Sequence, residues 1–312
     1  MSDEMQYQRD VYGKTLVELG AKNKRIVVLD ADLSGSTRTA FFAKEFPERF
    51  FNFGVAEQNM MATAAGLASC NKIVFASTFA MFATGRAWDQ VRNSICYSRK
   101  NVKIVATHAG ITVGPDGATH QALEDIAIMR VIPNMKVIVP CDGPQTRDAV
   151  MAAVNIDGPV YIRLGRSKIL TLENKGDFKI GQAQILKSGQ HAAIFACGVM
   201  VKKALDAQAV LAQGNINCSV INIHTIKPID QEIIQKMAQK TQGIVICEEH
   251  SVIGGLSCAI EEVITESSIG KPVVRIGVQN RFGQSGEPKD LMKEYHLDTE
   301  DIVNAVKKIL KN

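Results

Sequence analysis

Several signatures of common protein classes are absent from this chain of 312 residues. No apolar run is long enough to span a membrane, and the first residues, Met1-Ser2-Asp3-Glu4, lack the apolar core of a signal peptide. Neither the G-x-G-x-x-G loop of dinucleotide-binding proteins nor the G-x-x-x-x-G-K-[ST] phosphate loop occurs. These absences argue against a membrane or secreted protein and against two nucleotide-binding classes, so we expect a cytoplasmic protein.

The cysteines show no metal-binding or redox motif, because no two of them form a C-x-x-C pair. Their number is also odd, so they cannot all be paired in disulfides within the chain. The seven are Cys70, Cys96, Cys141, Cys197, Cys218, Cys247 and Cys258. Most lie in apolar segments, as buried thiols do. We expect reduced core residues, and the six histidines form no metal-ligand pattern. The chain itself is expected to hold no metal.

The overall charge is small. A net charge of +4 is too low and too dispersed to indicate a nucleic-acid partner, although it mildly favours anionic small substrates. The fractions of hydrophobic residues (46%) and charged residues (22%) are ordinary for a globular protein. No membrane partner is expected either.

Short β-branched segments alternate with helical patterns along the chain. In the first half, strands are predicted at 25–30, 72–76, 102–107, 135–140 and 159–164, with helices at 5–19, 37–46, 57–69, 86–97 and 143–154. After a polar connector the pattern restarts, with strands at 192–196, 218–223, 243–247 and 273–278 and helices at 201–213, 230–241, 254–267 and 299–310. We therefore predict an α/β protein of two domains, 1–170 and 185–312, joined by a linker at 171–184. Each domain is a mostly parallel sheet with helices on both faces.

A single glutamate, Glu57, stands where a glycine-marked strand end meets a helix of small residues. One interpretation is a carboxylate that only stabilises the helix N-terminus. The other is a partly buried carboxylate that faces a ligand nitrogen.

Two further clusters follow predicted strands, where ligands of parallel sheets bind. Phe79 and Phe82 either clamp a flat ring or belong to the core. The glycine-rich segment after strand 102–107 carries His108, Asp116 and His120, which offer proton exchange and hydrogen bonds to hydroxyl groups. A purely structural loop is the alternative.

A fourth cluster is cationic. Arg163 and Arg166 flank the end of strand 159–164, Arg9 lies in the first predicted helix, and Ser36 follows the first strand. Guanidinium groups and hydroxyls together suit a phosphate, whereas each arginine alone is as consistent with a solvated surface charge.

In their order, these segments resemble the C-terminal half of transketolase over nearly the whole chain. The resemblance is carried by Arg9-Asp10-Val11-Tyr12-Gly13, Asp30-Ala31-Asp32, Pro47-Glu48-Arg49-Phe50, Val55-Ala56-Glu57-Gln58-Asn59-Met60, Ser77-Thr78-Phe79, residues 114–120, Thr225-Ile226-Lys227-Pro228-Ile229-Asp230, Glu248-Glu249-His250 and Ser285-Gly286-Glu287-Pro288. It implies a pyrimidine-binding domain of the thiamine diphosphate fold followed by a transketolase C-terminal domain.

The resemblance also implies thiamine diphosphate chemistry, in which the cofactor carries the electrons. Glu57 would bind the aminopyrimidine nitrogen and favour the imino tautomer that deprotonates the thiazolium carbon. Phe79 and Phe82 match the pyrimidine-stacking aromatics, and Asp32 matches an aspartate beside the cofactor. Gly85 looks like an insertion at the edge of this pocket.

Substrate contacts carry over in the same way. His108, His120 and Asp116 would contact the sugar hydroxyls and carbonyl, with both histidines taking part in catalysis. Arg9, Ser36 and Arg166 would hold the phosphate. The implied reaction moves a two-carbon ketol unit from a ketose phosphate to an aldose phosphate in the pentose phosphate pathway.

Full-length transketolase begins with a domain that binds the diphosphate through Mg²⁺, using a G-D-G motif that this sequence lacks. We therefore expect a split enzyme whose Mg²⁺ ligands lie on an N-terminal partner subunit, assembled as an α2β2 heterotetramer and active only with that partner.

Three alternatives stay open: a 1-deoxyxylulose-5-phosphate synthase-like enzyme, a 2-oxo-acid dehydrogenase β-like enzyme, and a non-catalytic partner subunit.

Overall fold

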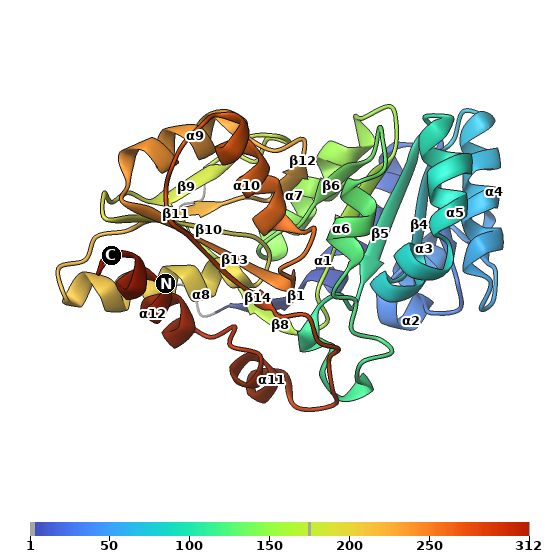
Figure 1. Ribbon diagram of the computed structural model, residues 1–312. Coiled ribbons are helices and arrows are strands. Elements are labelled where there is room, and N and C mark those ends of the chain that lie inside the picture. The colour runs from blue at the N-terminus through green and yellow to red at the C-terminus, as the bar shows by residue number, and fades with distance from the viewer. Residues whose placement is uncertain (1–3, 174–175, 312) are drawn as a thin grey trace.

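The computed structural model describes residues 4–173 and 176–311, which form two α/β domains side by side (Figure 1). The first domain contains a seven-stranded sheet of order β12-β6-β7-β5-β4-β2-β3. Its strands are β2 (Ile26–Asp30), β3 (Phe50–Asn52), β4 (Ile73–Phe79), β5 (Val102–Thr107), β6 (Lys136–Ile138), β7 (Val160–Arg163) and β12 (Thr225–Lys227). All neighbours are parallel except β12 and β6.

Helices cover both faces of this sheet because successive side chains of each buried strand point to opposite faces. Val28 of β2 packs in one core with α1 (Gln8–Lys22), α3 (Ala40–Glu45) and α7 (Gly143–Val154). Leu29 belongs to a second core with α4 (Glu57–Ser69) and α6 (Asp125–Arg130). The alternation explains why these strands read as continuous apolar runs.

The second domain contains a five-stranded sheet of order β14-β13-β10-β11-β9. Its strands are β9 (Gln184–Lys187), β10 (Ala192–Ala196), β11 (Ser219–Asn222), β13 (Gly243–Ser251) and β14 (Val273–Val278), with only β9 antiparallel. Helices α8 (Met200–Gln213) and α12 (Thr299–Ile309) cover one face, and α9 (Gln231–Lys240) and α10 (Leu256–Glu266) the other. The predicted fold class is therefore confirmed.

One apolar core is shared by the two sheets. Leu29 and Val74 of the first sheet, Phe195 of the second, and α9 and α10 all belong to it. Strand β12, from the second half of the chain, also extends the first sheet at its edge. This shared burial fixes the two domains against each other.

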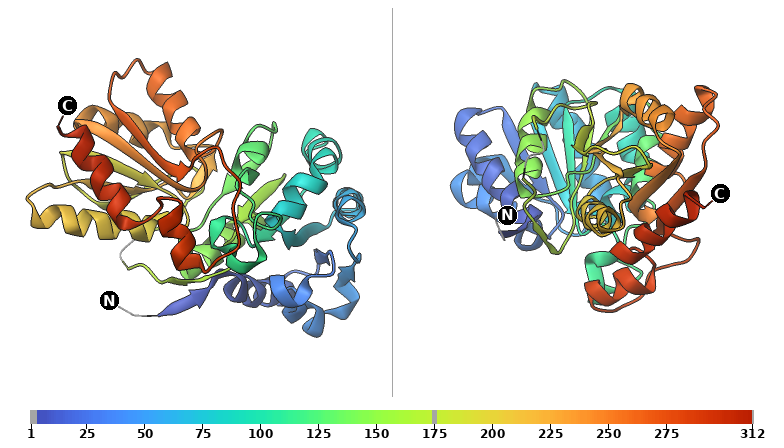
Figure 2. Two further views of the ribbon diagram at one scale, coloured as in Figure 1. Left: turned by 60° about the horizontal axis from the view of Figure 1, so that its bottom comes forward. Right: turned by 90° about the vertical axis from the view of Figure 1, so that its left-hand side faces the viewer.

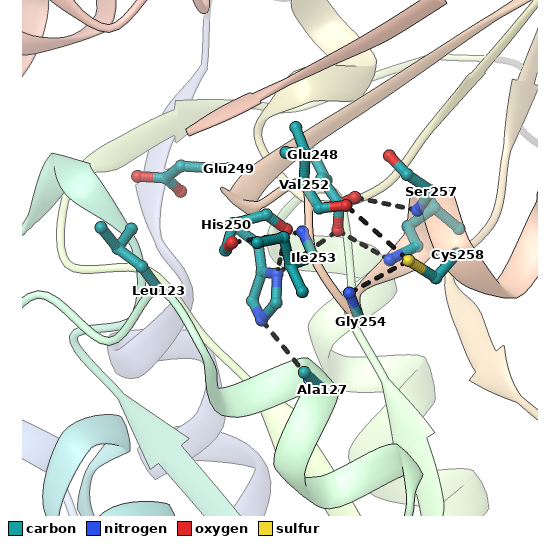
Figure 3. Close-up of polar contacts among 12 residues, drawn as sticks. Leu123, Ala127, Glu248, Glu249, His250, Val252, Ile253, Gly254, Ser257 and Cys258 are labelled. Carbon is teal, nitrogen blue, oxygen red and sulfur yellow. Dashed lines mark hydrogen bonds and ion pairs between the residues drawn. The ribbon is translucent and has the colours of Figure 1, made fainter. Parts of the chain in front are cut away.

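The segment Glu248-Glu249-His250 forms a polar part of the same interface (Figure 3). Glu248 accepts hydrogen bonds from the amides of Leu256 (2.7 Å) and Ser257 (2.8 Å) at the start of α10. The Nε2 atom of His250 accepts one from the amide of Ala127 in α6, at 3.4 Å. The motif thus connects α10 of the second domain to α6 of the first.

Glu249 faces the other way and completes a buried charge network. Its Oε1 accepts a hydrogen bond from the amide of Thr112 at 2.6 Å. Arg163 at the end of β7 donates from Nε to Asp125 (2.8 Å) and from Nη2 to the carbonyl of Glu249 (2.9 Å). Burial raises the pKa of the Glu249 carboxyl, and Arg163 opposes that rise.

Several predicted elements differ at their ends. The first helix begins at Gln8 rather than at residue 5, because 5–7 form β1 (Met5–Tyr7), which pairs with β8 (Lys168–Leu170). The helix predicted at 37–46 is split into α2 (Ser34–Thr37) and α3 by a left-handed residue, Arg38 (φ 69°). Short elements such as β3, β9, β12 and α11 (Pro288–Glu294) carry too few residues for a periodic signal and were not predicted.

Views from two other directions show the β1–β8 ribbon and helices α8, α11 and α12 on the same side of the molecule (Figure 2). Five of the seven cysteines are buried. Within the described ranges, no helix has the length and apolar character that a membrane crossing requires.

Candidate active site

The candidate residues come from four strands of the first sheet. Because β2, β4, β5 and β7 run parallel, their carboxyl ends meet at one edge of the sheet. Phe79 ends β4, His108 follows β5, and Arg166 lies just beyond β7. The parallel topology therefore brings together residues that are far apart in sequence.

Glu57 begins α4 and is almost fully buried, with an exposed fraction of 1%. No side chain caps the helix at Ala56. Instead, Nη1 of Arg86 donates to both carboxylate oxygens of Glu57, at 3.0 and 2.9 Å. The arginine side chain is 48% exposed, so a buried carboxylate is held by a group that reaches in from the surface. The interpretation of Glu57 as a simple helix cap does not describe this geometry.

Arg86 owes its position to a π-helical turn at Phe82–Arg86. A π turn closes with i→i+5 hydrogen bonds and so holds one residue more than an α turn. The residue predicted as an insertion, Gly85, lies within it. The turn sets the guanidinium of Arg86 over the Phe82 ring, 4.9 Å from its centroid.

Beside Arg86, the partner of Glu57, lies a cluster of four rings: Phe79, Phe82, His108 and His120. Phe79 stacks on His108, with centroids 3.9 Å apart, and lies 6.0 Å from Phe82 in a nearly parallel orientation. His120 meets the edge of Phe82 at 5.3 Å. Phe79 and His108 are buried, whereas Phe82 and His120 are half-buried. The cluster thus presents a partly open aromatic surface, which suits a flat ligand ring.

His108 is held neutral by its surroundings. Burial, followed by the nearby charges of Arg9 and Arg166, lowers the pKa of His108 to about 3. Its Nδ1 lies 2.8 Å from the hydroxyl of Thr107. At physiological pH this imidazole serves as a hydrogen-bonding group rather than a cation.

The cationic residues form a second side of the site. Burial, followed by the nearby charges of Arg38 and Arg166, lowers the pKa of Arg9 in α1. Nη1 of Arg166 donates to the carbonyl of Val113 at 2.8 Å. Nη1 of Arg9 donates to the carbonyl of Ser36 at 3.4 Å, and Nε of Arg9 is buried without a partner. An anion bound there would be attracted by the positive charge of the arginines and would accept a hydrogen bond from the unpartnered Nε of Arg9.

Three residues that were predicted to belong to the site make fewer side-chain contacts with it. Asp32 is exposed, and its carboxylate accepts a hydrogen bond from the side-chain amide of Asn52 at 3.3 Å. Asp116 is exposed beside Gly117. Ser36 contacts Arg9 through its carbonyl rather than its hydroxyl. The structure thus brings together Glu57, the ring cluster and the two arginines, and leaves these three side chains at the rim.

Sequence reasoning did not assign a role to Arg86, Arg38 or Asp30. Asp30 is fully buried at the end of β2 and accepts from Thr37 (2.7 Å) and Thr39 (2.8 Å). Burial raises the pKa of Asp30. Arg86 follows Phe82 by four residues, a helical spacing that could have indicated one shared face. No group of residues able to hold a metal ion occurs in the described part of the chain.

Comparisons with known proteins agree with this architecture. The family models "Transketolase, pyrimidine binding domain" and "Transketolase, C-terminal domain" match residues 4–170 and 181–302. A Methanocaldococcus jannaschii protein, whose name describes a C-terminal section of transketolase, is 52% identical over 97% of this chain and 96% of its own length. The 6-deoxy-6-sulfo-D-fructose transketolase subunit of a Clostridium species is 41% identical over 98% of this chain and 95% of that protein.

A solved structure shows the same fold. It is described as a split gene transketolase, an inactive β4 tetramer, and matches with a TM-score of 0.91 and 52% identity over 98% of both chains. The chain belongs to the transketolase family and is similar over its full length to subunits of split transketolases.

Proposed function

We propose that this chain is the C-terminal subunit of a two-subunit transketolase, which transfers a two-carbon ketol unit from a ketose phosphate to an aldose phosphate. One observation carries the proposal: the buried carboxylate of Glu57 opens onto a ring cluster that is flanked by Arg9 and Arg166. The acid and the aromatic surface suit the aminopyrimidine ring of the cofactor, and the anion site suits the phosphate of the sugar.

The residues present fit the pyrimidine half of thiamine diphosphate. Glu57 is buried, yet its partner Arg86 is a half-exposed side chain that can move aside for a ligand nitrogen. Phe79 and Phe82 would pack against the ring, and Asp32 lies at the rim. When bound, this cofactor supplies the nucleophilic carbon that carries the ketol unit.

His108 and His120 would orient the sugar. Since His108 stays neutral, its ring can hydrogen-bond a carbonyl or hydroxyl oxygen without adding charge. Asp116 is exposed on the adjoining segment and offers an acceptor for a sugar hydroxyl.

Arg9 and Arg166, with Ser36 beside them, would bind the terminal anion of the sugar. Guanidinium groups accept phosphate and sulfonate oxygens alike. The Clostridium relative is named for a sulfo sugar, so the anion of the preferred substrate is an open choice between these two groups.

We assign the diphosphate and Mg²⁺ to an N-terminal partner subunit, because relatives that match this chain over nearly their own whole length are named as a transketolase C-terminal section and a transketolase subunit. The relative solved as a tetramer of β chains alone is described as inactive, which supports this dependence. Closed two-fold symmetry favours an α2β2 assembly.

The test is a reconstituted complex assayed with xylulose 5-phosphate and an aldose phosphate. Glu57→Gln should reduce kcat/KM by about 10²–10⁴-fold, as for a proton-handling group, while Glu45→Gln, an exposed control, changes nothing. Turnover confined to pyruvate plus glyceraldehyde 3-phosphate would instead indicate a synthase. A complex with no activity toward either pair or toward a sulfonated ketose would indicate a non-catalytic subunit.

A further inference from the structure

We propose that a cavity between the two domains binds a small anionic molecule with an apolar body. The cavity measures about 490 Å³, within the usual range of ligand sites. The β1–β8 ribbon, the start of α8 and helix α11 surround it. Its lining is Met5, Thr112, Cys141, Ser167, Lys168, Ile169, Leu170, Val199, Lys202, Lys203, Pro288, Lys289 and Met292.

The charge of this lining has one sign. It includes four lysines and neither aspartate nor glutamate. Lys202 is paired with Asp206, and Lys203 with Asp298. For Lys168 and Lys289 no ion pair is seen among the described residues, so the cavity keeps an excess of positive charge.

The start of α8 adds to this charge. Helix N-termini carry partial positive charge and favour acidic side chains, yet the first turn of α8 has none and instead contains Lys202 and Lys203. No side chain caps the helix at Val199. Bound anions stabilise helix ends of this kind.

Strand β10 leads directly into α8, so Val199, Lys202 and Lys203 lie just beyond the carboxyl end of a central parallel strand. Ligands of α/β sheets bind beyond strand ends of this kind.

The apolar part of the lining selects the kind of anion. Met5, Ile169, Leu170, Val199 and Met292 contribute most of the wall that is not lysine. Besides Ser167, it offers few hydroxyl partners, so a sugar phosphate would leave its hydroxyls unsatisfied. An aryl phosphate, which has an apolar ring and one anionic group, suits both parts of the lining.

Such a ligand would touch the ribbon that carries the anion-binding arginines. Arg9 lies two residues after β1, and Arg166 two residues before β8. The Tyr7 ring lies between the guanidinium of Arg9 (4.8 Å) and the ammonium of Lys168 (5.2 Å). Occupancy of the cavity is thus connected to the substrate side by direct contacts.

The test is calorimetric titration of the full chain with phenyl phosphate. Phenyl phosphate should bind, and inorganic phosphate and phenol should bind at least about tenfold more weakly. Lys289→Ala and Lys202→Ala should each weaken binding about tenfold, the loss expected for one charge-assisted hydrogen bond. Val199→Trp should abolish it by filling the cavity.

The control is Lys236→Ala, which removes an exposed charge on α9 of the same domain. It should leave the affinity unchanged. Equal affinities in Lys236→Ala and Lys289→Ala, or inorganic phosphate binding as tightly as phenyl phosphate, would overturn the proposal. Because the readout requires no turnover, the result is independent of the proposed enzymatic function.

Discussion

Nη1 of Arg86 donates to both carboxylate oxygens of Glu57, at 3.0 and 2.9 Å, in a pair whose acid is buried and whose base is half-exposed. The pair neutralises a carboxylate that would otherwise be buried without compensation. A ligand that binds Glu57 must take over this hydrogen bonding. If Glu57 binds the cofactor as proposed, the arginine links the stability of the free chain to cofactor binding.

Arg86→Ala should lower the stability of the isolated chain by about 1–3 kcal/mol, because the Glu57 carboxylate loses its partner. Thermal unfolding followed by circular dichroism would measure this change. In the reconstituted complex, the same variant should bind thiamine diphosphate at least as tightly as wild type. Arg92→Ala, which removes an exposed arginine nearby, is the control. A tenfold loss of cofactor affinity in Arg86→Ala would show that Arg86 holds the cofactor instead.

Arg166→Gln should raise KM for phosphorylated substrates about 10–100-fold, because one charge-assisted contact is lost. The value of kcat should change far less. Initial rates with phosphorylated and unphosphorylated aldoses would separate the two effects. Arg147→Gln, an exposed substitution on α7, should leave both parameters unchanged. An equal loss with both kinds of aldose would rule out an anion-binding role.

Acidification should destabilise the protein through buried histidines. The pKa is about 3 for His108 and about 4 for His224, in both cases lowered from 6.5 chiefly by burial. The unfolded chain therefore binds protons that the folded chain does not, so the stabilisation is complete above pH 6.5 and is lost as the pH falls. Each histidine contributes a slope of about 1.4 kcal/mol per pH unit in this window.

Urea unfolding between pH 6.5 and 4 would measure that slope in His224→Gln. It should be shallower than in wild type by about 1.4 kcal/mol per pH unit, since the carboxylates that also titrate are common to both proteins. His296→Gln removes an exposed histidine and should leave the slope unchanged. Identical slopes in His224→Gln and wild type would contradict the assignment.

Arg163→Met should destabilise the chain by about 3–5 kcal/mol, because Asp125 and Glu249 then lie buried without their cation. Chemical denaturation is the measurement. The double variant Arg163→Met/Asp125→Leu should recover part of the loss, which a purely steric effect of methionine would not allow. Arg147→Met, at an exposed ion pair, should change stability by less than about 1 kcal/mol.

The long periodic elements could be predicted from the sequence. The predicted bounds of α4, α7 and β5 agree with the structure, because their apolar patterns and helix starts lie within each segment. The β1–β8 ribbon and β12 could not be found in this way. Each has three residues and exists only because a distant strand offers hydrogen-bond partners.

The candidate site likewise has features that the sequence predicts and features that depend on tertiary contacts. Motif order indicated Glu57, the phenylalanines, the histidines and the arginines, because the segments that carry them resemble those of the transketolase family. The pairing of Glu57 with Arg86 depends on a π turn that adds one residue to a helix. No local pattern specifies where such a turn closes.

By itself, the sequence determined the two-domain α/β class, the family and the chemical types gathered at one sheet edge. Only the tertiary structure decided which charges meet: Arg86 with Glu57, Arg163 with Asp125, and four lysines around one cavity. Burial and periodicity are properties of short segments, whereas an ion pair or a cavity depends on how distant segments pack together.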